Sequence, residues 1–181
     1  MSLLPILYMT KVNFLGRSGS MPEMEEELLE FEEDTQKGKY LTFLLDKEVY
    51  AIEIKFVTEI VGMQPITEIP ELPHYVKGII NLRGEIITVI DIRLRFKKKP
   101  AEYNDRTCVI VVKVQDASMG LIVDHVAEVL DIADDYVVSP SHLHSDQNNS
   151  YLKGIGKVGS EIKLILDCNK LFQTEDIDPL N

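Results

Sequence analysis

The chain has 181 residues, of which 45% are apolar and 27% charged, and its formal net charge at pH 7 is −11. This length suits one compact domain, or two small barrels that share a core. The composition excludes fibrous, collagen-like and wholly disordered proteins. The charge is uneven, because residues 21–38 hold eight acids and one base whereas residues 39–181 are only mildly acidic. Since an acidic body repels phosphate backbones, we expect no nucleic-acid partner.

Cysteine usage and hydropathy both predict a cytoplasmic protein. Cys108 and Cys168 are sixty positions apart, each within an apolar run. This is typical of buried free thiols in a reducing compartment. No apolar run approaches the ~20 residues of a membrane helix. The first residues also lack the basic leader and the small-residue cleavage site of a signal peptide. We therefore expect no direct membrane insertion.

The first 38 residues differ in amino-acid composition from the rest of the chain. Residues 1–20 contain a Gly-Arg-Ser-Gly-Ser stretch, which suggests an expression scar or an upstream start codon. Residues 22–36 combine many glutamates with few basic partners. We predict a flexible acidic N-terminal extension over residues 1–38, a folded domain over 39–175 and a C-terminal tail over 176–181.

Short β-branched and aromatic runs separated by polar turns predict a series of hairpins in the folded part. The predicted hairpins span residues 40–54, 79–90, 109–123 and 151–167. Turns about every ten residues favour an all-β barrel or sandwich with short helices. No fixed-period repeat is apparent, which argues against a solenoid or a propeller.

Three other segments are assigned less directly. Apolar residues at helical spacing predict one or two helical turns over residues 54–60, ended by Gly62. The pattern over residues 123–130 is compatible with a helix or a strand. Residues 169–172 are expected to form a short closing helix.

A search for catalytic chemistry finds no nucleophile–base set, no phosphate-binding loop and no Gly-x-Ser-x-Gly elbow. The sharpest metal-like cluster is His142, His144 and Asp146, but it lies in a stretch with loop composition and is interpreted as solvated. The basic run over residues 93–99 is interpreted as a solvated loop or as a rim contact for an acidic partner. We therefore predict a non-enzyme with no cofactor and no metal.

The segment over residues 76–93, VKGIINLRGEIITVIDIR, closely resembles the signature of the CheW family of chemotaxis coupling proteins. Further matches follow in the expected order: an opening hairpin over residues 40–54, GLIVDHV over 120–126 and YLKGIG over 151–156. The resemblance covers residues 39–175. One departure is Thr88, where the family commonly has proline, and a threonine suits a strand equally well.

The resemblance implies two five-stranded SH3-like β-barrels that share a hydrophobic core. It also implies a non-catalytic adaptor that binds the hairpin tip of chemoreceptors in a groove between the barrels. A second surface would bind the regulatory domain of the histidine kinase CheA and build a signalling array. The receptor-binding residues it implies are Val57, Glu59, Gly78, Arg83 and Val129. The kinase-binding residues it implies are Val138 and Leu143, whose residue types differ from those common in the family.

Arg83 can also be interpreted from the residues themselves. Gly84 can take positive φ and close a hairpin, which would hold Arg83 at an exposed edge. There its guanidinium could meet a carboxylate or a helix C-terminus of a partner, or it could cap a neighbouring strand of its own chain. The residues leave these two readings even, and the resemblance favours the partner.

Three other functions are compatible with parts of the sequence. The chain could be a regulatory-domain fragment of the kinase itself, which the acidic lead-in and the lack of an ATP-binding module argue against. A hybrid with a receiver domain would need about 100 further residues. From a different class, a metal-binding β-barrel enzyme could be built around His142, His144 and Asp146.

Overall fold

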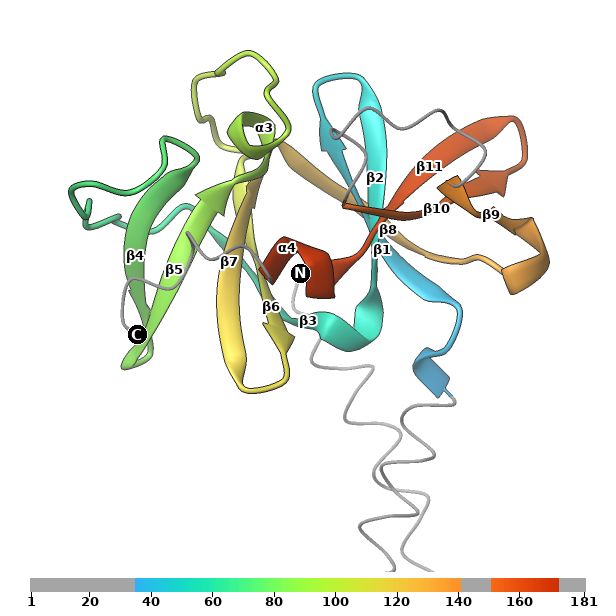
Figure 1. Ribbon diagram of the computed structural model, residues 1–181, viewed down its shortest axis with the longest axis horizontal. Coiled ribbons are helices and arrows are strands. Elements are labelled where there is room, and N and C mark those ends of the chain that lie inside the picture. Colours follow the sequence, from blue (N-terminus) through green and yellow to red (C-terminus); the bar gives the residue numbers. More distant parts are fainter. Residues whose placement is uncertain (1–34, 141–150, 173–181) are drawn as a thin grey trace, which may run out of the picture. The chain divides into compact units, whose positions relative to one another are not determined.

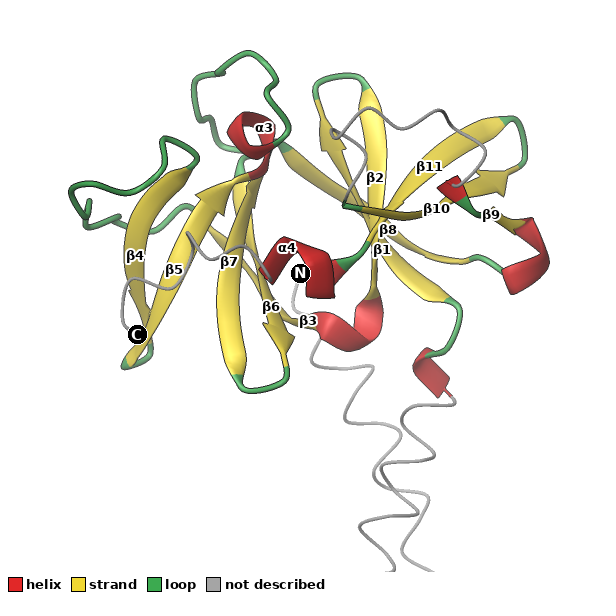
Figure 2. Cartoon of the chain, viewed as in Figure 1, coloured by secondary structure: helices red, strands yellow, loops and turns green. Residues whose placement is uncertain are grey.

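The computed structural model describes residues 35–140 and 151–172 of the chain (Figures 1 and 2). Its strands are β1 (Lys39–Leu45), β2 (Glu48–Glu53), β3 (Val57–Gly62), β4 (Val76–Leu82), β5 (Glu85–Asp91), β6 (Cys108–Val114), β7 (Ala117–Val123), β8 (His125–Asp131), β9 (Val137–Val138), β10 (Leu152–Val158) and β11 (Glu161–Leu166). Its helical turns are η1 (Ile54–Phe56), α3 (Ile92–Arg95), η2 (Asp134–Tyr136) and α4 (Cys168–Phe172). Within the described residues, no helix is long and apolar enough to span a bilayer.

The strands form two barrel-like sheets, which confirms the predicted fold class. The first barrel has the strand order β8-β1-β2-β11-β10-β9, and the second has the order β3-β6-β7-β5-β4. Neighbouring strands are antiparallel except for β2 with β11 and β5 with β7, which are parallel. In Figure 1 the early strands β1 and β2 lie with the late strands β10 and β11, whereas β4 to β7 form the other barrel.

The chain therefore passes between the barrels twice. It leaves the first barrel through η1, between β2 and β3, and it returns at Asp124, between β7 and β8. The first barrel combines β1 and β2 with β8 to β11 and therefore cannot form from one continuous segment, whereas the second barrel consists of the consecutive strands β3 to β7. Asp124 is the single residue between the last strand of the second barrel and β8 of the first.

The largest hydrophobic cluster is shared by the two barrels. It includes Phe43 and Leu41 from β1 as well as Ile110 and Val112 from β6. Val109 and Val111, the alternate residues of β6, point to the opposite face and pack inside the second barrel. This strand is a continuous apolar run because both of its faces are buried.

The four predicted hairpins are present, one other expectation needs correction, and one ambiguous segment is resolved. The predicted helical turns over residues 54–60 are limited to η1, and the chain is extended from Val57 onward. The β-branched residues of this segment pair with β6 instead, so sheet formation outweighs the helical spacing. The ambiguous segment over residues 123–130 is extended: Val123 ends β7, and from His125 onward the chain forms β8, which pairs with β1.

The two barrels also share one strand plan, although no fixed-period repeat is apparent in the sequence. β4 and β5 of the second barrel correspond to β10 and β11 of the first, and each pair carries a register shift after its first residue. The Lys-Gly dipeptide recurs at this shift, as Lys77-Gly78 and as Lys153-Gly154. Four more pairs within these strands and the residues that directly follow them are identical at the same offset of 76 positions: Ile79 and Ile155, Glu85 and Glu161, Ile86 and Ile162, and Asp91 and Asp167. The repeat occurs only twice, and its spacing exceeds the about 20–50 residues that are typical of solenoids and propellers.

Candidate functional site

Two of the residues implied as receptor-binding, Glu59 and Arg83, form an ion pair. Glu59 lies on β3 and Arg83 in the turn after β4, and these are the two outermost strands of the second barrel's sheet. Arg83 Nη2 is 3.1 Å from Glu59 Oε2. The Arg83 side chain remains 78% exposed, against 28% for that of Glu59. The pair thus joins the two sheet edges while most of the guanidinium stays open to solvent.

Local backbone geometry places both side chains. Arg83 and Gly84 have φ values of 55° and 94°, so the hairpin turn has two positive-φ residues. Asn81 supports it, because its Oδ1 accepts a hydrogen bond of 2.8 Å from the Gly84 N–H. On β3, a register shift between Val57 and Glu59 marks a β-bulge, and such bulges re-aim the residues that follow them.

Gly78 has a structural reason to be glycine. Its φ is +131°, and an added Cβ would lie 2.1 Å from the backbone oxygen of Thr67. Thr67 and Ile79 exchange two backbone hydrogen bonds of 2.9 Å each, which close the second barrel beside β4. Gly78 is buried, and this close approach to the Thr67 backbone is sufficient reason for a glycine here.

The two valines implied as receptor-binding lie on different barrels. Val57 begins β3 in the second barrel and packs partly buried against the shared core. Val129 lies on β8 of the first barrel and is 39% exposed. The candidate receptor residues therefore do not form one contiguous cluster on one barrel, since they are divided between the two.

Val138, implied as kinase-binding, lies on the two-residue strand β9 at the outer edge of the first barrel. It is 54% exposed, and the neighbouring β10–β11 region adds Ile162, which is 63% exposed. Tyr136, just before β9, is 61% exposed. Large apolar side chains exposed on one edge of a sheet and the strands beside it are typical of protein-binding surfaces. Leu143 lies outside the described residues, as do His142, His144 and Asp146.

The basic run over residues 93–99 is not a solvated loop, and that interpretation needs correction. Arg93 makes a two-point ion pair with Asp124, and Lys98 Nζ is 2.6 Å from Glu48 Oε2. The Arg95 guanidinium stacks 4.2 Å from the ring centre of Tyr75 and 4.9 Å from that of Tyr151. The sequence pattern showed the charges but not their partners, which come from distant strands.

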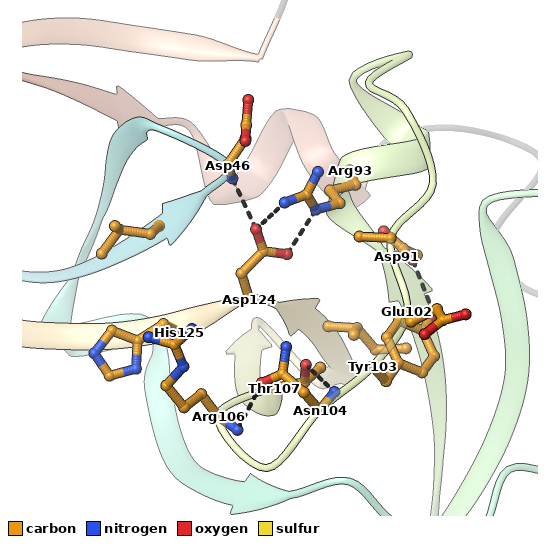
Figure 3. A pocket seen from close by; sticks show the side chains of 13 residues that line it. Asp46, Asp91, Arg93, Glu102, Tyr103, Asn104, Arg106, Thr107, Asp124 and His125 are labelled. Atoms are coloured by element: carbon orange, nitrogen blue, oxygen red, sulfur yellow. Dashed lines mark hydrogen bonds and ion pairs between the residues drawn. The ribbon is translucent and has the colours of Figure 1, made fainter.

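Figure 3 shows the cavity beside the Arg93–Asp124 pair, which has a volume of about 260 Å³. Its walls come from both barrels, with Asp46 from the β1–β2 turn and Tyr103 from the connection before β6. The Tyr103 hydroxyl donates to the buried Asp91 carboxylate at 2.9 Å. Burial and that carboxylate raise the pKa of Tyr103 well above its usual range, so it stays protonated.

The polar groups of this cavity serve structure. Asp91 Oδ1 accepts from the backbone N–H of Leu94 at 3.2 Å and caps α3. Burial would raise the pKa of Asp124, but hydrogen bonds from Arg93 and from the Asp46 N–H outweigh it and lower that pKa. Among residues 35–140 and 151–172, no group of three or more His, Cys, Asp or Glu side chains could hold a metal ion.

The CheW-like domain model matches residues 39–176. The chain belongs to the CheW family. Its relatives include the chemotaxis protein CheW of Treponema pallidum, 34% identical over 80% of this chain and 88% of the relative. Another is CheW of Klebsiella aerogenes, 32% identical over 80% of this chain and 87% of the relative. CheW of Helicobacter pylori is 32% identical over 87% of this chain and 90% of the relative.

The fold agrees with this family assignment. The crystal structure of the scaffolding protein TtCheW from Thermoanaerobacter tengcongensis superimposes with a TM-score of 0.72 at 34% identity, covering 79% of this chain and 97% of that one. The function of this CheW-family chain is that of a chemotaxis adaptor or scaffold. The second barrel is inserted between β2 and β8 of the first and shares its core, which suits such a role because it ties two surfaces into one folded unit.

Proposed function

We propose that this chain couples chemoreceptors to the histidine kinase CheA without catalysis, at the cytoplasmic face of receptor arrays. One surface would bind the receptor hairpin tip and the other the regulatory domain of the kinase. The observation that carries the proposal is the division of the candidate residues into two different surfaces. The Glu59–Arg83 pair lies on the second barrel, and the exposed apolar edge around Val138 lies on the first.

The receptor-side proposal rests on the state of Arg83. Its exposed ion pair with Glu59 contributes only about 0–1 kcal/mol to stability. A guanidinium has five N–H donors, and with 78% of the side chain exposed Arg83 can bind Glu59 and still donate to a partner's carboxylate. Both readings of Arg83 from the sequence are then compatible: it is paired within its own chain and available to a receptor.

A scaffold of this kind acts through binding alone. It can change kinase activity only as far as its affinity differs between the conformational states of its partners. The residues that matter are therefore those that set the two affinities and the geometry between the two surfaces. We propose that Arg83, Glu59 and Val129 set the affinity for the receptor and that Val138 sets the affinity for the kinase.

Charge reversal at the pair tests the receptor surface. Arg83→Glu should greatly weaken binding to a soluble receptor-tip hairpin, because like charges across an interface cost several kcal/mol. Binding to the isolated kinase regulatory domain, measured by calorimetry, should not change. The matched control is Lys113→Glu, which makes the same charge change at an exposed β6 position outside both surfaces.

The double variant Glu59→Arg/Arg83→Glu separates the two roles of the arginine. It restores an ion pair within the chain but leaves the reversed charge facing the receptor. We expect it to bind the receptor tip as poorly as Arg83→Glu does. Full recovery of receptor binding would show that Arg83 acts only through Glu59, and the proposed receptor contact would then be wrong.

A further inference from the structure

Asp124 connects the last strand of the second barrel to the next strand of the first barrel. It follows β7 and precedes β8, the strand that carries Val129. Its Oδ2 accepts a hydrogen bond of 2.7 Å from the backbone N–H of Asp46, in the β1–β2 turn of the first barrel. Its own N–H donates to the Leu44 carbonyl at 3.3 Å. Asp124 is thereby fixed to the first barrel by side chain and backbone.

The same carboxylate is held from the second barrel by Arg93. Arg93 lies on α3, directly after β5, and its Nε donates to Asp124 Oδ1 at 2.7 Å while its Nη2 contacts Oδ2. Only 14% of the Arg93 side chain and 28% of that of Asp124 are exposed. A guanidinium that grips a carboxylate with two nitrogens is directional as well as strong. Figure 3 shows Arg93 and Asp46 on either side of Asp124.

Two neighbouring contacts link the barrels beside this pair. Lys98, shortly after α3, bonds Glu48 of β2 in the first barrel at 2.6 Å. The Arg95 guanidinium lies against Tyr75, which precedes β4, and Tyr151, which precedes β10. The segment from α3 to Lys98 therefore contacts the first barrel at Glu48 and Tyr151, beside the Arg93–Asp124 pair.

We propose that Arg93 and Asp124 are positioning residues that fix the orientation of the two barrels and, with it, the spacing of the candidate receptor residues. The shared apolar core holds the barrels together, but apolar burial is non-directional and does not by itself select one angle. The Arg93–Asp124 ion pair makes two contacts where the chain passes between the barrels, and such a directional contact can select one angle between them. This inference rests on the proposed function, because the receptor surface has members on both barrels.

The two proposed surfaces should depend on this pair to different degrees. Val129 lies on β8, which directly follows Asp124, whereas Glu59 and Arg83 lie on the second barrel. A change of inter-barrel angle would separate these receptor residues. Val138 lies within the first barrel alone, so kinase binding through that edge should be insensitive to the same change.

The test measures geometry and binding on the full chain. Spin labels are placed at Lys113→Cys on β6 and Lys157→Cys on β10, both exposed, with Cys108 and Cys168 replaced by alanine. Arg93→Gln and Asp124→Asn should each broaden or shift the label-to-label distance distribution of the unbound protein. Lys153→Gln is the matched control, since it breaks an ion pair of 2.8 Å with Glu53 that lies within the first barrel.

Binding of the receptor tip should weaken by about fivefold or more in both pair variants, the lower end of ordinary coupling between sites. Kinase-domain binding should change less than twofold. Arg93→Lys keeps the charge but loses the two-point contact, and it provides a folded comparison. Its affinity for the receptor tip should lie between that of the wild type and that of Arg93→Gln.

An unchanged distance distribution in folded Arg93→Gln or Arg93→Lys would overturn the inference, as would equal losses of receptor and kinase binding. A changed distribution in a protein that never binds the receptor tip, even as the wild type, would leave the orienting role intact and contradict the proposed function instead.

Discussion

Replacing Gly78 by alanine tests whether this position acts through the barrel or through a partner. The added Cβ would lie 2.1 Å from the Thr67 oxygen and 2.8 Å from its carbonyl carbon, both backbone atoms that cannot rotate away. Holding a non-glycine residue at φ +131° adds about 1–3 kcal/mol of strain. Loss of the two Thr67–Ile79 hydrogen bonds would add about 1 kcal/mol each.

The expected loss is therefore roughly 3–5 kcal/mol, which corresponds to a fall in melting temperature of about 10–15 °C for a domain of this size. Two other glycines calibrate the measurement. At Gly84, φ is +94° but nothing lies within 4 Å of an added Cβ, so Gly84→Ala should show backbone strain alone. Gly62 has neither a positive φ nor a close neighbour, so Gly62→Ala should change stability by less than about 0.5 kcal/mol.

Urea unfolding followed by circular dichroism would rank the three variants. We predict that Gly78→Ala loses the most stability, Gly84→Ala loses less and Gly62→Ala loses almost none. If Gly78→Ala is as stable as the wild type and loses only receptor binding, the bridge at Thr67 is not what requires the glycine. Gly78 would then belong to the receptor surface directly.

Two further predictions concern titratable groups. Because its hydrogen bonds lower the folded-state pKa of Asp124, this group stabilises the fold at neutral pH, and the contribution is lost as pH falls below about 4 and through the folded value. Urea midpoints measured between about pH 6 and pH 3 should fall less steeply in Asp124→Asn than in the wild type, and parallel curves would contradict this. Burial raises the pKa of the Cys168 thiol to about 12, so alkylation in native protein at about pH 8 should be very slow and become fast only on unfolding. Peptide mapping by mass spectrometry separates it from Cys108, and rapid native labelling of Cys168 would show that the thiol is not buried.

Much of the architecture could be predicted because its signals are local. Alternating apolar residues and a two-residue turn such as Arg83-Gly84 define a hairpin without reference to the rest of the chain. The strand order could not be obtained in this way. Nothing near β2 indicates that it pairs in parallel with β11, more than one hundred residues later.

The candidate site also divides into features that the sequence indicates and features that only the fold reveals. Resemblance supplied Glu59 and Arg83, and the structure adds that they are partners across two sheet edges. Gly78 was assigned to the receptor surface on the same basis, but its reason for being glycine is the backbone of Thr67, eleven positions earlier. Arg93 and Asp124 each stand within a family-like motif, yet the sequence gives no sign that the two motifs meet.

The most direct test of the coupling proposal is whether one molecule of this chain can hold both partners at once. Receptor-tip hairpin fixed to beads would be incubated with the kinase regulatory domain, with and without the chain, and the retained kinase domain quantified. We predict that retention requires the chain, is lost with Arg83→Glu on the receptor side and is lost with Val138→Asp on the kinase side. Retention that is equally strong without the chain, or competition between the two partners for it, would contradict the account.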